Sequence, residues 1–237
     1  MITLYGMGSP NVVKVYIALE ELRLPYEVRP VDVFAGAQFD ADFLKLNPLA
    51  KVPVITDSDG PGGEPISVFE SGAILLYLAD KTGELLPHDP RPRANAIQWM
   101  MVQMTNIGPM CGQLVHFKRF APAGNDYAVS RYATQVHRLF ELYDQRLASQ
   151  SWVGGAEYSI ADIAAFPWLR IGAMLLGDAA AAEFGNVRGW VDRIAARPAV
   201  QRALAAVDRV RTQTTQFDKA SPENLDRLLG RGKFAAA

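Results

Sequence analysis

Four residues near the N-terminus, Gly8-Ser9-Pro10-Asn11, follow an expected first strand and begin an expected first helix. The free backbone N–H groups and the positive dipole end at a helix start favour an anion. A thiolate is such an anion, and a hydrogen bond from Ser9 or Asn11 would stabilise it by about 1.5–3 kcal/mol. The same residues also suit a plain helix cap with Pro10 in the first turn. The pattern therefore indicates a thiolate-binding helix start or a cap.

The chain has a single cysteine, Cys111, and three histidines that are far apart, His88, His116 and His137. One cysteine cannot form an intrachain disulfide, a Cys-x-x-Cys redox pair or a thiolate metal cluster. The histidines lie in different sequence contexts, so we expect no metal site. Any thiol chemistry must therefore take its sulfur from a ligand.

Two further dipeptides could bind an extended ligand. A cis bond at Val52-Pro53 would turn the backbone N–H and C=O of Val52 outward, although a trans bond is the ordinary expectation. Glu70 and Ser71 stand at another helix start, where the carboxylate could accept from a ligand ammonium and the Ser71 N–H could bind a ligand carboxylate. Helix capping alone is the alternative for this pair.

The composition is that of an ordinary globular protein. Of 237 residues, 49% are hydrophobic and 21% charged, and 24 Lys plus Arg against 25 Asp plus Glu give a net charge of -1. This balance gives no electrostatic case for nucleic acid or an anionic membrane as the main partner. The longest apolar stretch, residues 73–79, is far shorter than the ~20 residues of a membrane-spanning helix. The N-terminus also lacks the basic region of a signal peptide, so we expect a soluble, cytoplasmic protein.

Hydrophobic periodicity predicts an α/β unit in the first third of the chain. Strands are expected at 2–5, 26–33, 52–55 and 66–69, with helices at 12–22, 41–46 and 71–81. This βαβ-α-ββ-α order predicts a small domain with a mixed sheet, which we place at residues 1–83.

The remainder of the chain predicts an all-α domain at residues 92–210. Three prolines in residues 87–92 suit a linker, and Ser159 to Asp162 resembles a structural capping box. Residues 211–237 are polar and irregular, so we expect a C-terminal tail that is loosely docked or disordered. Helical spacing recurs in five segments, near 93–110, 129–147, 160–176, 187–196 and 199–210.

The order and spacing of several motifs resemble the glutathione transferase superfamily over residues 1 to about 210. Within it, other motifs resemble the nu class, the bacterial relatives of the fungal nitrogen-catabolite regulator. The superfamily motifs are Leu4-Tyr5, Ser9-Pro10-Asn11, Gln38-Phe39, Asn47-Pro48, Lys51-Val52-Pro53 and Phe69 to Leu78. The nu-class motifs are Gly36 to Phe39, Gly63-Glu64-Pro65, Gly108-Pro109-Met110, His116-Phe117 and Tyr127-x-x-x-Arg131-Tyr132.

The resemblance implies a thioredoxin-like N-terminal domain, a helical-bundle C-terminal domain, a homodimer and a cis bond before Pro53. It implies two glutathiones or one glutathione disulfide per site, without a metal. It also implies that Arg131 reaches the second glutathione, from the same or the partner subunit, whereas a solvated surface arginine is the other interpretation.

The resemblance also implies glutathione contacts for five residues. Gln38 and Lys51 would bind the glycine carboxylate end. Val52 would pair with the cysteinyl backbone, and Glu70 and Ser71 would hold the γ-glutamyl group. Glutathione is an extended anionic tripeptide with one ammonium, so a cation, backbone amides and a carboxylate in a row suit it.

The function implied is glutathione-dependent disulfide-bond reduction, in which Ser9 and Asn11 stabilise a glutathione thiolate that attacks a disulfide. Family members often have Thr where this chain has Ser9, and both residues keep the hydroxyl. Two alternatives remain open. One is a transferase that conjugates glutathione to electrophiles, and the other is a non-enzymatic, glutathione-binding regulatory protein. The second substrate would be a small disulfide, a peroxide or an electrophile.

Overall fold

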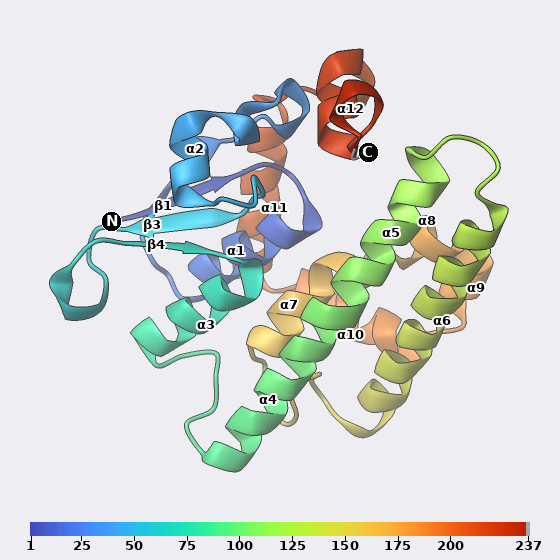
Figure 1. The fold of residues 1–237 in the computed structure, drawn as a ribbon. Coiled ribbons are helices and arrows are strands. Elements are labelled where there is room, and N and C mark those ends of the chain that lie inside the picture. Colours follow the sequence, from blue (N-terminus) through green and yellow to red (C-terminus); the bar gives the residue numbers. More distant parts are fainter. Residues whose placement is uncertain (236–237) are drawn as a thin grey trace. The chain divides into compact units, whose positions relative to one another are not determined.

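The structure is a computed structural model, and it describes residues 1–235. The chain divides into two compact units (Figure 1). One unit combines residues 1–74 with the chain from Gln201 onward, and the other is Leu75–Val200. The sequence analysis placed a helical domain at residues 92–210. In the structure, the chain from Gln201 onward makes its contacts with residues 1–74.

The N-terminal unit is built on a four-stranded mixed sheet of order β2-β1-β3-β4. β1 runs parallel to β2 and antiparallel to β3, and β3 is antiparallel to β4. This is the predicted βαβ-α-ββ-α order. Its elements are β1 (Ile2–Gly6), α1 (Pro10–Glu21), β2 (Tyr26–Pro30), α2 (Ala41–Leu46), β3 (Val54–Asp57) and β4 (Ile66–Phe69), with the short 3₁₀ turns η1 (Val33–Ala35), η2 (Ala37–Phe39) and η3 (Pro61–Gly63). Helix α3 (Ser71–Thr82) begins in this unit and continues into the Leu75–Val200 unit.

Strand β2 ends at Pro30, earlier than the predicted residue 33. The Asp32 side chain accepts from the Ala35 N–H and caps η1, so the chain leaves the sheet there. Strand β3 begins at Val54, two residues later than predicted, because Val52 and Pro53 belong to the preceding loop. Both shifts lengthen the loops at the end of the sheet where the predicted ligand contacts lie.

The C-terminal segment, residues 212–234, is ordered and belongs to the N-terminal unit. Its elements after α11 (Pro198–Arg211) are η5 (Phe217–Lys219), α12 (Pro222–Leu229) and η6 (Gly232–Phe234). Helix α12 contacts η1, and Figure 1 shows it in red beside the blue chain that follows β2. The sequence analysis expected a loosely docked or disordered tail here and did not predict these helical elements.

The Leu75–Val200 unit is helical, as predicted. Figure 1 shows α4 and α5 as one long green rod, joined through the π-helical turn η4, with α6 beside α5. Every residue of α7 is buried, which makes it the central helix of the unit. The helices are α4 (Pro90–Val102), η4 (Gln103–Ile107), α5 (Gly108–Arg119), α6 (Asp126–Ser149), α7 (Ile160–Leu169), α8 (Gly172–Leu176), α9 (Asp178–Ala182) and α10 (Gly185–Ala195).

Two of the differences from the predicted helix boundaries have a local cause. Helix α4 begins at Pro90, inside the expected linker, because proline suits the first helical position, where its missing N–H has no intrahelical partner. The predicted helix 160–176 is two helices, since Ile171 leaves the helical dihedral range at φ -99 and ψ 24. Within residues 1–235 we find no helix long and apolar enough to cross a membrane, and no group of acidic, histidine or cysteine side chains that could hold a metal ion.

Candidate active site

The sheet register brings every predicted ligand segment of the N-terminal unit to one edge of the sheet. Gly6 pairs with Pro30, Tyr5 with Val54, and Val54 with Phe69. The ends of β1, β2 and β4 and the start of β3 therefore meet at this edge. The chain continues from it into the segments that carry Ser9 and Asn11, Gln38, Lys51 to Pro53, and Glu70 and Ser71.

At the first of these segments, Ser9 is the N-cap residue of α1 and has extended backbone dihedrals. Its carbonyl accepts from the N–H groups of Val12 and Val13. Within residues 1–235, however, its side chain makes no capping hydrogen bond. Pro10 and Asn11 occupy the first two helical positions. The Ser9 hydroxyl is therefore not used as a helix cap, which was one of the two interpretations from sequence.

A cation that the sequence did not single out lies beside this turn. A Cβ placed on Gly8 would meet the Cγ and Nε atoms of Arg211 at 2.6 Å, so the arginine side chain packs directly against the glycine. The guanidinium also pairs with Asp208 at 3.3 Å. Gly8 thus makes room for a positive charge next to the residue that precedes the helix.

The loop before β3 is organised by Asn47, which is buried. Its Nδ2 donates to the Lys51 carbonyl at 2.7 Å, and its Oδ1 accepts from the Leu49 N–H at 3.0 Å. The Val52-Pro53 peptide bond is cis, as the resemblance implies. Val52 packs against a small core of Val31, Phe43 and Val54, while Lys51 is exposed. The loop is therefore held at both ends.

Gln38 is the most deeply buried polar residue of the turn after β2, with 1% of its surface exposed. Among the described residues, neither Oε1 nor Nε2 of its side chain has a hydrogen-bond partner. Buried polar groups are nearly always paired, so a buried free amide is a group that a ligand can satisfy. A carboxylate could accept from Nε2, which fits the contact that the resemblance assigns to Gln38.

The C-terminal segment holds the turn that carries Gln38. The Asp32 carboxylate accepts from the N–H and the hydroxyl of Thr215 at 2.9 and 2.7 Å. Phe217 packs edge to face on Phe34, and the Arg227 guanidinium lies 4.1 Å from the centre of the Phe39 ring. These contacts fix the residues on both sides of Gln38.

The last predicted segment is the turn from β4 into α3. Glu70 is exposed and has a positive φ of 69°, a conformation that is uncommon outside glycine. Ser71 begins α3 and is buried, and its Oγ accepts from the ammonium of Lys14 in α1 at 3.2 Å. Burial lowers the pKa of Lys14 to about 7, against the opposing effect of the Glu70 carboxylate.

Sequence reasoning missed Lys14 because it stands in an otherwise apolar stretch of α1. Residues 12–19 are all buried, and Lys14 is the charged residue among them. Its charge could have marked a functional position. A charged residue within an apolar helix face was the available signal, because lysine is almost never fully buried without a partner.

The helical unit carries the remaining candidates. Arg131 is exposed on α6, as its departure from the apolar stripe predicted, and its neighbour Tyr132 stacks on Phe117. Cys111 is completely buried in α5, and burial raises the pKa of its thiol to about 12. At neutral pH this thiol is protonated and inaccessible, so it cannot act as a nucleophile.

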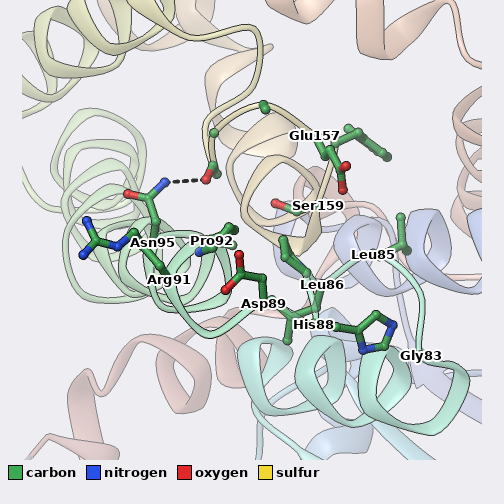
Figure 2. A pocket seen from close by; sticks show the side chains of 16 residues that line it. Gly83, Leu85, Leu86, His88, Asp89, Arg91, Pro92, Asn95, Glu157 and Ser159 are labelled. Atoms are coloured by element: carbon green, nitrogen blue, oxygen red, sulfur yellow. Dashed lines mark hydrogen bonds between the residues drawn. The ribbon is translucent and has the colours of Figure 1, made fainter.

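A cavity of about 670 Å³ lies within the helical unit, between the start of α4 and the loop before α7 (Figure 2). Figure 2 shows Asn95 donating across it to the Gly154 carbonyl, with His88, Asp89 and Glu157 around its rim. The predicted ligand residues are not among those that line it. The cavity is therefore lined by residues of the helical unit alone.

Comparison with known proteins identifies the family to which this chain belongs. Residues 1–80 match the N-terminal domain of glutathione S-transferase, and residues 107–198 match its C-terminal domain. The chain is 45% identical to the disulfide-bond oxidoreductase YfcG of Escherichia coli K12 over 205 residues, which are 86% of this chain and 94% of that protein.

Two solved structures resemble this one throughout most of their length. A glutathione transferase family member from Pseudomonas fluorescens Pf-5, with two glutathione bound, has a TM-score of 0.82 and 43% identity, covering 86% of this chain and 92% of that one. A glutathione transferase from Pseudomonas putida, with one glutathione disulfide bound per subunit, has a TM-score of 0.81 and 41% identity over 86% and 90%. The chain belongs to the glutathione S-transferase family of glutathione-dependent enzymes.

Proposed function

We propose that this protein is a glutathione-dependent disulfide-bond oxidoreductase in which Ser9 and Asn11 stabilise a glutathione thiolate at the start of α1. The observation that carries the proposal is the combination of a Ser9 hydroxyl that does not cap its own helix with a sole cysteine that is buried and protonated. The attacking sulfur must then belong to the ligand. The similarity to a disulfide-bond oxidoreductase supports this reaction.

The helix start can supply the required stabilisation. The helix dipole contributes ~0.3–1 kcal/mol to an anion, and a charge-assisted hydrogen bond adds ~1.5–3 kcal/mol. At ~1.36 kcal/mol per pKa unit, this lowers the pKa of a bound thiol by roughly one to three units. A thiol with an ordinary pKa near ~8.5 is then substantially ionised at neutral pH.

The rest of glutathione extends along the sheet edge. In our proposal Lys51 and Gln38 bind the glycine carboxylate, with the unpaired Gln38 amide as a donor. The backbone of Val52, beside the cis Pro53, pairs with the cysteinyl residue. Glu70 and Ser71 hold the ammonium and carboxylate of the γ-glutamyl group.

The reaction is two successive thiol-disulfide exchanges. The first glutathione thiolate attacks one sulfur of the substrate disulfide, forms a mixed disulfide and releases the other sulfur as a thiolate. A second glutathione then attacks the mixed disulfide, which yields glutathione disulfide and the second substrate thiol. The relatives with two glutathiones or one glutathione disulfide bound support this stoichiometry. Glutathione is kept reduced in the cytosol, so this chemistry suits a cytoplasmic enzyme.

The test is glutathione-driven reduction of a small mixed disulfide, coupled to glutathione reductase, for the wild type, Ser9→Ala and Asn11→Ala. Each variant loses one donor to the thiolate, so kcat/KM should fall about 10–100-fold, the equivalent of a charge-assisted hydrogen bond. Ser149→Ala, which removes an exposed hydroxyl at the end of α6, is the control and should keep full activity.

Full activity in Asn11→Ala would contradict the mechanism. Aryl halide conjugation is measured on the same preparations, since fast conjugation with negligible disulfide reduction would identify a conjugating transferase instead. Glutathione binding without turnover of any disulfide, peroxide or electrophile would identify a regulatory binding protein.

A further inference from the structure

Lys14 is a buried cation next to the proposed γ-glutamyl subsite. Only 1% of its surface is exposed, and it is among the largest fully buried side chains of the chain. Burying an ammonium without compensation is costly, so such a residue needs a partner inside the protein. Its ammonium donates to the Ser71 hydroxyl at 3.2 Å.

The turn from β4 into α3 has a strained backbone that neighbouring contacts must hold in place. Glu70 has a left-handed backbone with φ 69°, and such residues cluster at ligand-binding sites, where neighbouring contacts hold them. The hydrogen bond from α1 to Ser71 fixes the residue immediately after Glu70. Lys14 thus connects α1 to the first residue of α3.

The charge state of Lys14 decides the direction of the Ser71 hydroxyl. A charged ammonium can only donate, so Ser71 Oγ accepts from it and the hydroxyl hydrogen points elsewhere. A neutral amine can accept, and the hydroxyl can then turn inward and donate to it. Hydrogen bonds in a chain also strengthen one another, which makes Ser71 a better donor when Lys14 is charged.

We propose that Lys14 is a positioning residue of the glutathione site, which by donating to Ser71 orients the Ser71 hydroxyl toward the ligand's γ-glutamyl carboxylate and becomes protonated when that carboxylate binds. The inference rests on the proposed placement of glutathione at Glu70 and Ser71. The proton comes from solvent and moves to Nζ, and no covalent bond changes.

The pKa of Lys14 depends on its burial, on the Glu70 carboxylate and, in the complex, on the carboxylate and ammonium of the ligand. Burial makes its charged form costly, and the Glu70 carboxylate partly offsets that cost. A bound ligand adds a second carboxylate, while its ammonium pairs with Glu70. The carboxylate favours the charged lysine, so the pKa of Lys14 rises from about 7 on binding. Binding therefore takes up a proton between that pKa and the higher pKa of the complex, and affinity decreases as pH rises through this range.

The probe is S-methylglutathione, which has no thiol to ionise. Its binding to the full chain is measured by calorimetry from pH 5.5 to 8.5 in two buffers of different ionisation enthalpy, which gives the number of protons taken up. We expect uptake of a fraction of a proton per site above pH 7 and an affinity that falls about tenfold across the range. The three histidines all lie at positions 88–137, outside the N-terminal unit that carries the site.

Three lysine variants separate the role of Lys14 from general stability. Lys14→Met should abolish the proton uptake and flatten the pH profile at the weaker affinity. Lys14→Arg, which stays charged, should flatten it at the stronger affinity. Lys45→Met removes an exposed lysine that pairs with Asp42 at 2.7 Å, and it should leave the wild-type profile unchanged.

Binding to the wild type without proton uptake would overturn the proposal, whether or not the variants fold. Uptake that persists in Lys14→Met, or an absence of S-methylglutathione binding, would also overturn it. Disulfide reduction is assayed in parallel. Retained reductase activity with pH-independent binding rejects the role of Lys14 alone, whereas proton-linked binding without any reductase activity rejects the proposed function alone.

Discussion

Asp162 is a buried carboxylate that organises the helical unit. Its oxygens accept from the N–H of Val153 at 2.8 Å, the N–H of Ser159 at 3.1 Å and the indole N–H of Trp190 at 2.8 Å. It thereby completes a capping box at the start of α7 and joins that helix to α10. Burial raises its pKa to about 6 even though these hydrogen bonds oppose the shift.

This pKa shift makes a prediction about stability and pH. The unfolded chain loses the Asp162 proton near pH 4 and the folded chain near pH 6, so burial of the carboxylate disfavours folding increasingly as pH rises between these values. The free energy of unfolding of the wild type should fall relative to that of Asp162→Asn by roughly 2 kcal/mol over this window. Urea denaturation at pH 4, 5 and 6 measures the difference.

The exposed carboxylate of Asp178 provides the matched control. Asp178→Asn should show no such change relative to the wild type between pH 4 and 6. A constant difference between the wild type and Asp162→Asn across the window would contradict the raised pKa.

A local signal made the role of Asp162 predictable from sequence, whereas the interactions of Lys14 and Gln38 depend on residues far away in the chain. A capping box joins residues three apart, so it can be read from the chain directly. The partner of Lys14 is Ser71, 57 residues away, and the turn that carries Gln38 is held by Thr215, which bonds Asp32 from 183 residues away. The resemblance identified Gln38 and Ser71 as ligand residues, but the hydrogen bond from Lys14 to Ser71 depends on tertiary packing.

At the scale of elements, α12 in the C-terminal segment is a helix that the sequence analysis did not predict. Its local signals were nevertheless present, because Ser221 caps α12, Pro222 stands at the first helical position and Gly230 ends the helix with φ 63°. The helix has only eight residues, which is shorter than the window over which apolar periodicity predicts a helix. Short helices that depend on docking are poorly marked by periodicity.

This segment should contribute to glutathione affinity through the turn that carries Gln38. A chain ending at Arg211 loses the Asp32–Thr215 hydrogen bonds and the contacts of Phe217 and Arg227. Ordering that turn then has to be provided by the ligand, so KM for glutathione should rise about fivefold, the equivalent of roughly 1 kcal/mol, with little change in kcat. Steady-state kinetics of disulfide reduction measures both.

A second, shorter truncation tests which contacts of the segment lower the KM for glutathione. A chain ending at Gln216 keeps the Asp32–Thr215 hydrogen bonds and loses only Phe217 and the elements after it. Its KM should lie between those of the wild type and the shorter chain. An unchanged KM in the chain ending at Arg211 would exclude this role for the segment.

At the scale of the whole molecule, the proposed second glutathione contact is Arg131, which lies outside the N-terminal unit. Ser9 and Asn11 belong to the N-terminal unit, and Arg131 is an exposed residue of the helical unit. We expect Arg131 to bind the second glutathione as a cation facing a carboxylate, so Arg131→Ala should lower the kcat/KM of disulfide reduction about tenfold. Calorimetry should then find one glutathione per chain where the wild type binds two, with binding at the Ser9 site retained.

A homodimer allows two arrangements of this site, and a mixed dimer distinguishes them. Asn11→Ala and Arg131→Ala chains carrying different tags are expressed together, and the heterodimer is purified through both tags. If Arg131 serves the partner's site, one of the two sites combines an intact Asn11 with an intact Arg131, and half of the wild-type activity returns. If it serves its own site, both sites keep one defect and the activity stays at the level of the single variants. A monomer in light scattering would exclude the first arrangement, and wild-type activity in Arg131→Ala would exclude any role for this arginine.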